Sequence, residues 1–280
     1  MSEYYCLVAG LPEITFDGGK VGYSVDKFKE EVLPQLSARD VRLVNLSFNK
    51  IDNANILLLL RYGAEAELSS IGCYTKEQLL DIISVSKEGD GRSKEVPAYI
   101  YDFLDFYFEN IERDLFWDDI LSSYYYAYAA AAPNKLVSQW FQFNRNVNNI
   151  LVAMLARKYK LNIAESVVGD DEITEMIRTS GARDFGLSGI IDYLDEIVRI
   201  SENNKLQERE RQLDDMRLKW LEDNSVFDYF TVERLFVFLE KLMVVERWSK
   251  LDAERGMQCY KDIIEELKSG AVFTDELNKK

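Results

Sequence analysis

The absence of proline from the C-terminal half of the chain constrains its fold more than any other feature. Pro133 is the last of four prolines in 280 residues, and residues 134–280 contain none. Proline interrupts helices, so a long proline-free stretch of this composition favours one helix after another. Within this stretch, Phe143–Lys160 (FNRNVNNILVAMLARKYK) places apolar side chains three and four residues apart, the period of a helix that buries one side. The sequence therefore predicts an all-α protein.

A polar pattern recurs along the chain at a fixed interval. Asn55 lies in the apolar stretch Ile51–Tyr62, and Asn149 lies 94 positions later in the stretch described above. A further step of the same length reaches Met243, which takes the place of the asparagine and makes the third copy weaker. The motif positions are Asp52, Asn55 and Arg61 in the first copy, Asn146, Asn149 and Arg157 in the second, and Glu240 and Arg247 in the third.

The two asparagines require a physical account, because a buried amide must find hydrogen-bond partners. Asp52 and Asn55, or Asn146 and Asn149, are three residues apart and therefore share one side of a helix. We expect these side chains to fix the packing of their helices by bonding to the ends or loops of neighbouring helices. Direct contact with a partner protein is the alternative, and no catalytic role is expected.

Two glycine-rich loops divide the chain into three predicted units of similar length. The loops are SVSKEGDGRSKEVP and TSGARDFGLSG, and they delimit residues 1–90, 91–183 and 184–280. The first unit opens with Tyr4–Gly10, which we expect to be a short extended segment or strand. A Ser37-x-x-Asp40 pattern, Thr75 and the Gly169–Glu172 stretch mark helix starts.

Further helices are expected in each unit. The pattern predicts a helix from Val25 to Leu36 in the first unit and a single long helix from Ile190 to Trp220 in the third. A pair of helices, Phe227–Trp248 and Ala253–Leu267, is expected to complete the chain.

Composition excludes several classes of function. The formal net charge of -15, with no cluster of Lys and Arg, disfavours binding to nucleic acid or anionic lipid. The chain has no histidine and only three scattered cysteines, which argues against histidine-dependent catalysis, zinc sites and other cofactors. Adjacent carboxylates such as Asp170 and Asp171 indicate a solvent-exposed helix face. An enzyme that uses carboxylates and a metal is a remaining alternative. Neither a signal peptide nor a membrane-spanning segment is expected.

Three helical units, of which two carry the Asn-x-x-Asn or Asp-x-x-Asn motif followed by an arginine, resemble the C subunit of archaeal and bacterial A/V-type rotary ATPases. This subunit is called d in eukaryotic V-ATPases. The N-terminal YYCLVAGLPEI and the overall length are more similar still to a bacterial family whose genes accompany V-type ATPase genes. That second resemblance covers nearly the whole chain, whereas the first rests on the short motifs.

The resemblance implies a funnel-like, pseudo-threefold arrangement of three helical bundles and a non-catalytic role. The protein would link the central rotor shaft to the membrane proteolipid ring, with no active site, no cofactor, no small-molecule substrate and no direct insertion into the membrane. Its location would be cytoplasmic, held at the membrane through the ATPase complex. The other class of function left open by the residues is a helical scaffold or adaptor that binds a different protein.

Overall fold

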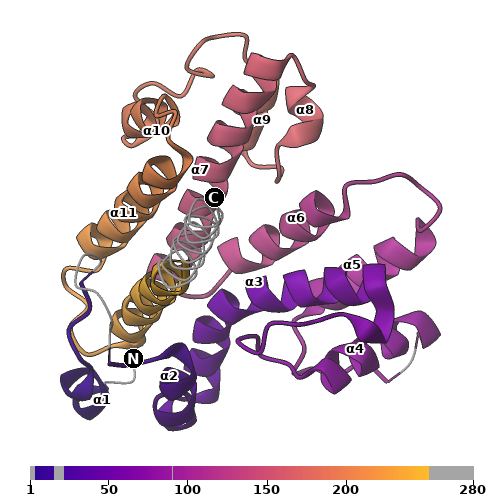
Figure 1. The fold of residues 1–280 in the computed structure, drawn as a ribbon, viewed down its shortest axis with the longest axis vertical. Helices are drawn as coiled ribbons and strands as arrows, with labels where there is room; N and C mark the ends of the chain where they lie inside the picture. The colour runs from indigo at the N-terminus through magenta and orange to yellow at the C-terminus, as the bar shows by residue number, and fades with distance from the viewer. Residues whose placement is uncertain (1–3, 16–21, 90, 252–280) are drawn as a thin grey trace, which may run out of the picture.

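All regular secondary structure in the described residues is helical (Figure 1). The computed structural model describes residues 4–15, 22–89 and 91–251, and no β-strand occurs among them. This confirms the predicted all-α class. The helices are α1 (Tyr5–Gly10), α2 (Val25–Glu31), η1 (Leu33–Gln35), α3 (Ala38–Tyr62), η2 (Gly63–Glu65), α4 (Lys76–Glu88), α5 (Ala98–Glu109), α6 (Trp117–Ala130), α7 (Lys135–Tyr159), α8 (Ile163–Ser166), α9 (Glu172–Thr179), α10 (Leu194–Ser201), α11 (Leu206–Asn224) and a last helix that covers residues 232–251.

Helix starts follow the local capping chemistry that the sequence indicates. The Ser37 hydroxyl accepts a hydrogen bond from the Asp40 N–H at the start of α3. Thr75 and Gln78 form a reciprocal capping box at the start of α4, and the Asp171 side chain caps α9. Each cap satisfies N–H groups that have no partner within the helix. The starts of these three helices are therefore set by local sequence.

Two hydrophobic clusters hold the helices together, and α3 contributes to both. Its second half, with Ile56 and Leu59, packs into a large cluster formed with α4–α7 and α9–α11. Its first half, with Val44 and Phe48, packs into a smaller cluster with α1, α2 and the 232–251 helix. With 25 residues, α3 is about 37 Å long at 1.5 Å per residue. It is therefore a rigid rod that joins the two clusters.

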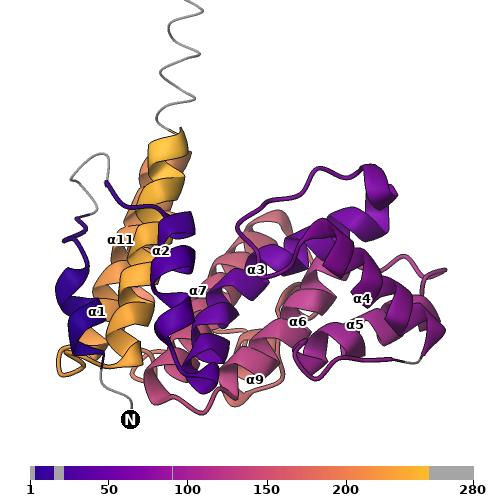
Figure 2. The same cartoon turned by 90° about the horizontal axis from the view of Figure 1, so that it is seen from below.

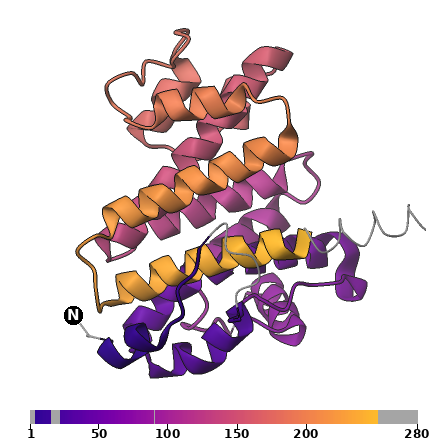
Figure 3. The same cartoon turned by 60° about the vertical axis from the view of Figure 1, so that its left-hand side comes forward.

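The last helix lies beside α11 and runs antiparallel to it (Figure 3). Asp214 on α11 bonds to Arg247 and Trp248, whereas Glu222, two turns further along α11, pairs with Lys241. The described part of the third predicted unit, residues 184–251, therefore divides between the clusters, because α10 and α11 belong mainly to the large one and the 232–251 helix mainly to the small one. The predicted unit boundaries and the funnel-like arrangement stay predictions. The expected Ala253–Leu267 helix lies outside the described residues.

The N-terminal segment is a helix, so the prediction of an extended Tyr4–Gly10 was wrong. The Tyr4 N–H donates to the Phe230 carbonyl at 2.6 Å, and the Tyr4 hydroxyl donates to the buried Asp40 carboxylate. The Tyr5 ring contacts the Phe230 ring at a centroid distance of 4.3 Å. A six-residue apolar run carries too little periodicity to separate helix from strand, so this docking decides its conformation.

Two other predicted helices are interrupted. The expected Ile190–Trp220 helix is wrong as a single element, because α10 ends at Ser201 and α11 begins at Leu206. The Asn203 side chain accepts from the Lys205 N–H at 2.9 Å, a local bond that replaces a helical one and lets α11 fold back. The expected Val25–Leu36 helix splits into α2 and η1, with Pro34 in the first turn of η1.

No helix within residues 4–15, 22–89 and 91–251 combines the length and apolar character required to cross a bilayer.

Candidate functional site

Asn55 and Asn149 make the same pair of hydrogen bonds in two different parts of the chain. Asn55 Nδ2 donates to the Ser69 carbonyl and Asn55 Oδ1 accepts from the Ser69 N–H, both at 2.9 Å. Asn149 Nδ2 donates to the Val168 carbonyl at 2.7 Å, and Asn149 Oδ1 accepts from the Val168 N–H at 2.9 Å. Both asparagines are buried. Each amide thus ties a 25-residue helix to the segment that follows it, and we call the two pairs the amide anchors.

The position three residues before each anchor differs between the copies. Asp52 accepts from the N–H groups of Cys73 and Tyr74 at 3.0 and 3.3 Å, and from Asn49 Nδ2 at 3.3 Å. Burial raises the pKa of the Asp52 carboxyl, and these hydrogen bonds oppose the rise. Asn146 instead donates to the Tyr193 hydroxyl at 3.4 Å. The two side chains therefore stabilise different neighbouring segments.

The motif arginines also differ in their surroundings. Arg61 forms an exposed ion pair with Asp118 at 3.5 Å. Arg157 donates to the carbonyls of Ser180 and Arg183 at 2.8 and 3.1 Å, and its guanidinium lies 3.8 Å from the centre of the Phe185 ring. An exposed pair contributes little to stability, whereas the contacts of Arg157 close the loop after α9. The structural equivalence of the copies thus resides in the anchors alone.

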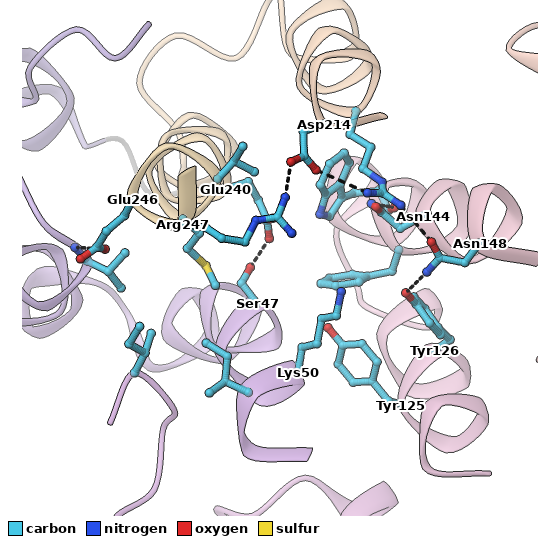
Figure 4. Close-up of a pocket in the computed structure, with 18 of the residues that line it drawn as sticks. Ser47, Lys50, Tyr125, Tyr126, Asn144, Asn148, Asp214, Glu240, Glu246 and Arg247 are labelled. Carbon is cyan, nitrogen blue, oxygen red and sulfur yellow. Dashed lines mark hydrogen bonds and ion pairs between the residues drawn. The ribbon is translucent and has the colours of Figure 1, made fainter. Parts of the chain in front are cut away.

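The third motif copy lies at a pocket instead of forming an amide anchor. Glu240 accepts from the Ser47 hydroxyl of α3, and Arg247 pairs with Asp214 of α11 (Figure 4). The structure therefore brings Glu240 and Arg247 to one site, whereas the six motif residues of α3 and α7 lie outside the pocket lining.

The pocket has a volume of about 390 Å³ and lies where several helices converge, with Val25 at the start of α2 among its lining residues. Helices α3, α6, α7 and α11 and the 232–251 helix each contribute side chains to it. Aromatic and aliphatic groups form much of its wall, and polar groups enter it from several sides. The lining residues that matter for its chemistry are Lys50, Tyr125, Trp140, Arg217, Glu240 and Arg247.

Asp214 is the centre of a polar network at one side of this pocket. Its buried carboxylate accepts from Trp248 Nε1 at 2.7 Å and forms ion pairs with Arg217 and Arg247. The network continues as Arg217 donates to Asn148 Oδ1 at 2.9 Å and Asn148 Nδ2 donates to the Tyr126 hydroxyl at 3.1 Å. These bonds satisfy the buried carboxylate and fix both guanidinium groups at the pocket.

Lys50 and Glu240 line the pocket, and the pKa of each side chain is shifted from its ordinary value. The surrounding protein lowers the pKa of the Lys50 ammonium by desolvation, and the nearby charges of Arg217 and Arg247 lower it further against the opposing effect of Glu240. Burial raises the pKa of the Glu240 carboxyl, opposed by the Ser47 hydrogen bond and the Lys50 charge. The Lys50 side chain forms no ion pair with another described residue, and none is drawn to it in Figure 4.

Sequence reasoning missed Lys50, Asn148, Asp214 and Arg217 as site residues. Asp214 and Arg217 lie in the highly charged stretch QERERQLDDMRLKW, where they resemble their exposed neighbours. The spacing of Asn144 and Asn148 by four residues, on the helix that carries Asn149, is the one signal that could have indicated a second polar face. Among the residues with described positions, no cluster of three or more Cys, Asp and Glu side chains is arranged to hold a metal ion.

Comparisons with known proteins identify one family. A family model described as "protein of unknown function (DUF2764)" matches residues 1–271. No curated protein and no solved structure matches the chain.

Proposed function

We propose that this chain, which belongs to the family described as protein of unknown function DUF2764, is a non-catalytic coupling subunit of a V/A-type rotary ATPase. In this role it links the central rotor shaft to the membrane proteolipid ring and transmits torque between them. ATP hydrolysis belongs to other subunits of the complex.

The amide anchors are the observation that carries this proposal. The sequence resemblance to the rotor subunit depends on repeated helical units, and Asn55 and Asn149 bind their following segments through the same two-bond geometry. Both anchors belong to helices of 25 residues. A buried amide that bonds to a neighbouring backbone limits sliding of the helix, which suits a part that bears torque.

Exposed apolar side chains on two opposite sides of the molecule support a role between two partners. Phe227 and Tyr229 are 88% and 62% exposed in the turn before the 232–251 helix, close to α1. Ile111 and Phe116 are 56% and 78% exposed in the loop between α5 and α6. Figure 2 places α1 and α5 at opposite sides of the molecule. Exposed aromatic residues are typical of protein interfaces.

The proposal is tested by purifying the native complex. An affinity-tagged copy is expressed in the source organism, membranes are solubilised in mild detergent, and captured proteins are identified by mass spectrometry. We expect rotor-shaft and proteolipid subunits in constant ratio to the tagged protein. The proposal would be contradicted if the membranes hold active, intact ATPase complexes and the tagged protein is nevertheless captured without any ATPase subunit.

A helical adaptor for a different protein is the second candidate, and the same exposed aromatic residues favour it. The variants Phe227→Ser and Phe116→Ser separate the two functions. A coupling subunit has a different ATPase neighbour at each side, so each variant is expected to lose a different one. An adaptor with one binding surface loses its single partner in one variant and retains it in the other.

A further inference from the structure

The pocket between α3, α6, α7, α11 and the 232–251 helix concentrates positive charge in an acidic protein. The chain carries a net charge of -15, yet Lys50, Arg217 and Arg247 converge on this cavity. Two carboxylates, Asp214 and Glu240, face them. Three cations therefore meet two carboxyl groups at this cavity. The charges of Glu246 and Lys250 at the same pocket compensate each other in an ion pair of 3.5 Å.

The bonds of Asp214 leave Lys50 without a direct ion-pair partner among the described residues. Asp214 is occupied by the Trp248 indole and both guanidinium groups. Figure 4 shows Lys50 extending from α3 past Tyr125 into the pocket, with no hydrogen bond or ion pair drawn to it. An anion beside the ammonium would offset the repulsion that Arg217 and Arg247 exert on it. The position of Lys50 thus favours a negatively charged group from outside the described chain.

The walls of the pocket suit an apolar or aromatic body. Trp140 and Phe141 of α7, Tyr125 of α6 and Met243 of the 232–251 helix line the same space as the cations. A volume of about 390 Å³ lies within the range of small-molecule sites. Aromatic rings provide flat apolar surface, and methionine adapts to irregular shapes.

We propose that this pocket binds a small organic anion, with its carboxylate, sulfonate or phosphoryl group at Lys50 and its apolar body against Trp140 and Tyr125. Arg247 provides the second positive charge at the headgroup. The site is independent of the coupling role, because its ligand binds within one chain and requires no ATPase subunit.

The experiment uses two matched fluorescent probes on the purified full chain. Anilinonaphthalene sulfonate carries one negative charge on an aromatic body, whereas phenylnaphthylamine has the same ring system without the charge. We expect saturable binding of the sulfonate at one site per chain. Lys50→Met is expected to weaken it about tenfold, equivalent to about 1.4 kcal/mol, whereas Lys50→Arg retains it. Binding of the neutral probe is expected to be unaffected by either substitution.

Two further variants keep the test decisive. Lys87→Met removes an exposed lysine of α4 and is expected to leave binding unchanged, since this side chain is remote from the pocket lining. Met243→Glu introduces a carboxylate into the pocket and is expected to weaken sulfonate binding at least as strongly as Lys50→Met. Circular dichroism verifies that each variant is folded. Equal binding by wild type, Lys50→Met and Met243→Glu, or no saturable binding by the wild type, would overturn the proposal.

Naphthoate and naphthyl phosphate then distinguish the headgroup by displacing the bound sulfonate. A carboxylate site favours the first competitor, and a phosphoryl site favours the second. If either competitor displaces the sulfonate probe from a site whose affinity depends on Lys50, the result supports an organic-anion site. Failure of both to displace the probe would restrict the site to sulfonates and refute the wider ligand class.

Discussion

Replacing Asn149 gives the sharpest test of the amide anchors. Asn149→Ala removes both bonds to Val168 and leaves a backbone N–H and a carbonyl without their partner. An unsatisfied buried polar group costs roughly 1–3 kcal/mol. Val168 is half-buried, so water compensates part of the loss and we expect about 2 kcal/mol of destabilisation. With a urea m-value of about 3 kcal/mol per molar, this lowers the unfolding midpoint by about 0.7 M.

Asn149→Asp adds a dependence on pH that a general packing defect does not produce. The new carboxylate keeps the acceptor for the Val168 N–H but directs a negative oxygen at the Val168 carbonyl, so its folded-state pKa rises above its unfolded value. The folded state then binds a proton more tightly, and stability falls as pH rises through the unfolded and then the folded pKa. We expect a loss of about 3 kcal/mol at neutral pH that recovers in acid, where the protonated acid can donate to the carbonyl.

Two comparisons make this prediction refutable. Asn55→Ala should destabilise the protein by only about 1 kcal/mol, because Ser69 is exposed and water replaces the lost bonds. Asn224→Ala removes an exposed bond to the Trp220 carbonyl and should change stability by less than about 0.5 kcal/mol. Urea unfolding followed by circular dichroism measures all four variants. The reasoning fails if Asn149→Ala is as stable as Asn224→Ala, or if Asn149→Asp gains nothing at low pH.

Two further substitutions test the surroundings of the anchor and the pocket. Gly72→Ala places a Cβ against the Asp52 carboxylate and should lower the free energy of unfolding in urea by about 2 kcal/mol. Gly181→Ala, where the Cβ meets open space, should leave it unchanged. Equal stabilities of the two variants would refute the steric argument. Glu240→Gln removes a carboxyl whose pKa burial raises, so its stability relative to wild type should grow as pH rises above about 4.5 through the raised pKa. Urea midpoints of both proteins across this range measure the difference, and a difference that shrinks with rising pH would contradict the assignment.

Local features of the structure were predictable from sequence, and the failures have identifiable causes. The caps at Ser37, Thr75 and Asp171 depend on bonds within one turn, and the sequence pattern contained each of them. The break between α10 and α11 depends on an Asn203 bond that competes with helix geometry, which an apolar period does not register. Helix α1 owes its conformation to docking on Phe230, far away in the sequence.

The candidate site was harder to predict than the fold. Glu240 and Arg247 were selected as a degenerate third motif copy, but the pocket where they lie also requires Lys50 and Asp214. Lys50 differs little in sequence context from any lysine on a partly buried helix. Its chemical setting arises only when Arg217 of α11 and Arg247 of the last helix are brought to the same cavity.

The sequence by itself determined that this protein is helical, where several helices begin, and that Asn55 and Asn149 recur in helical stretches with an apolar face. These properties follow from interactions between residues a few positions apart, because the helical period and the capping bonds are local. Only the tertiary structure decided which helices meet. Ser47 and Glu240 are 193 positions apart and share one hydrogen bond, so no local pattern could place them at the same pocket.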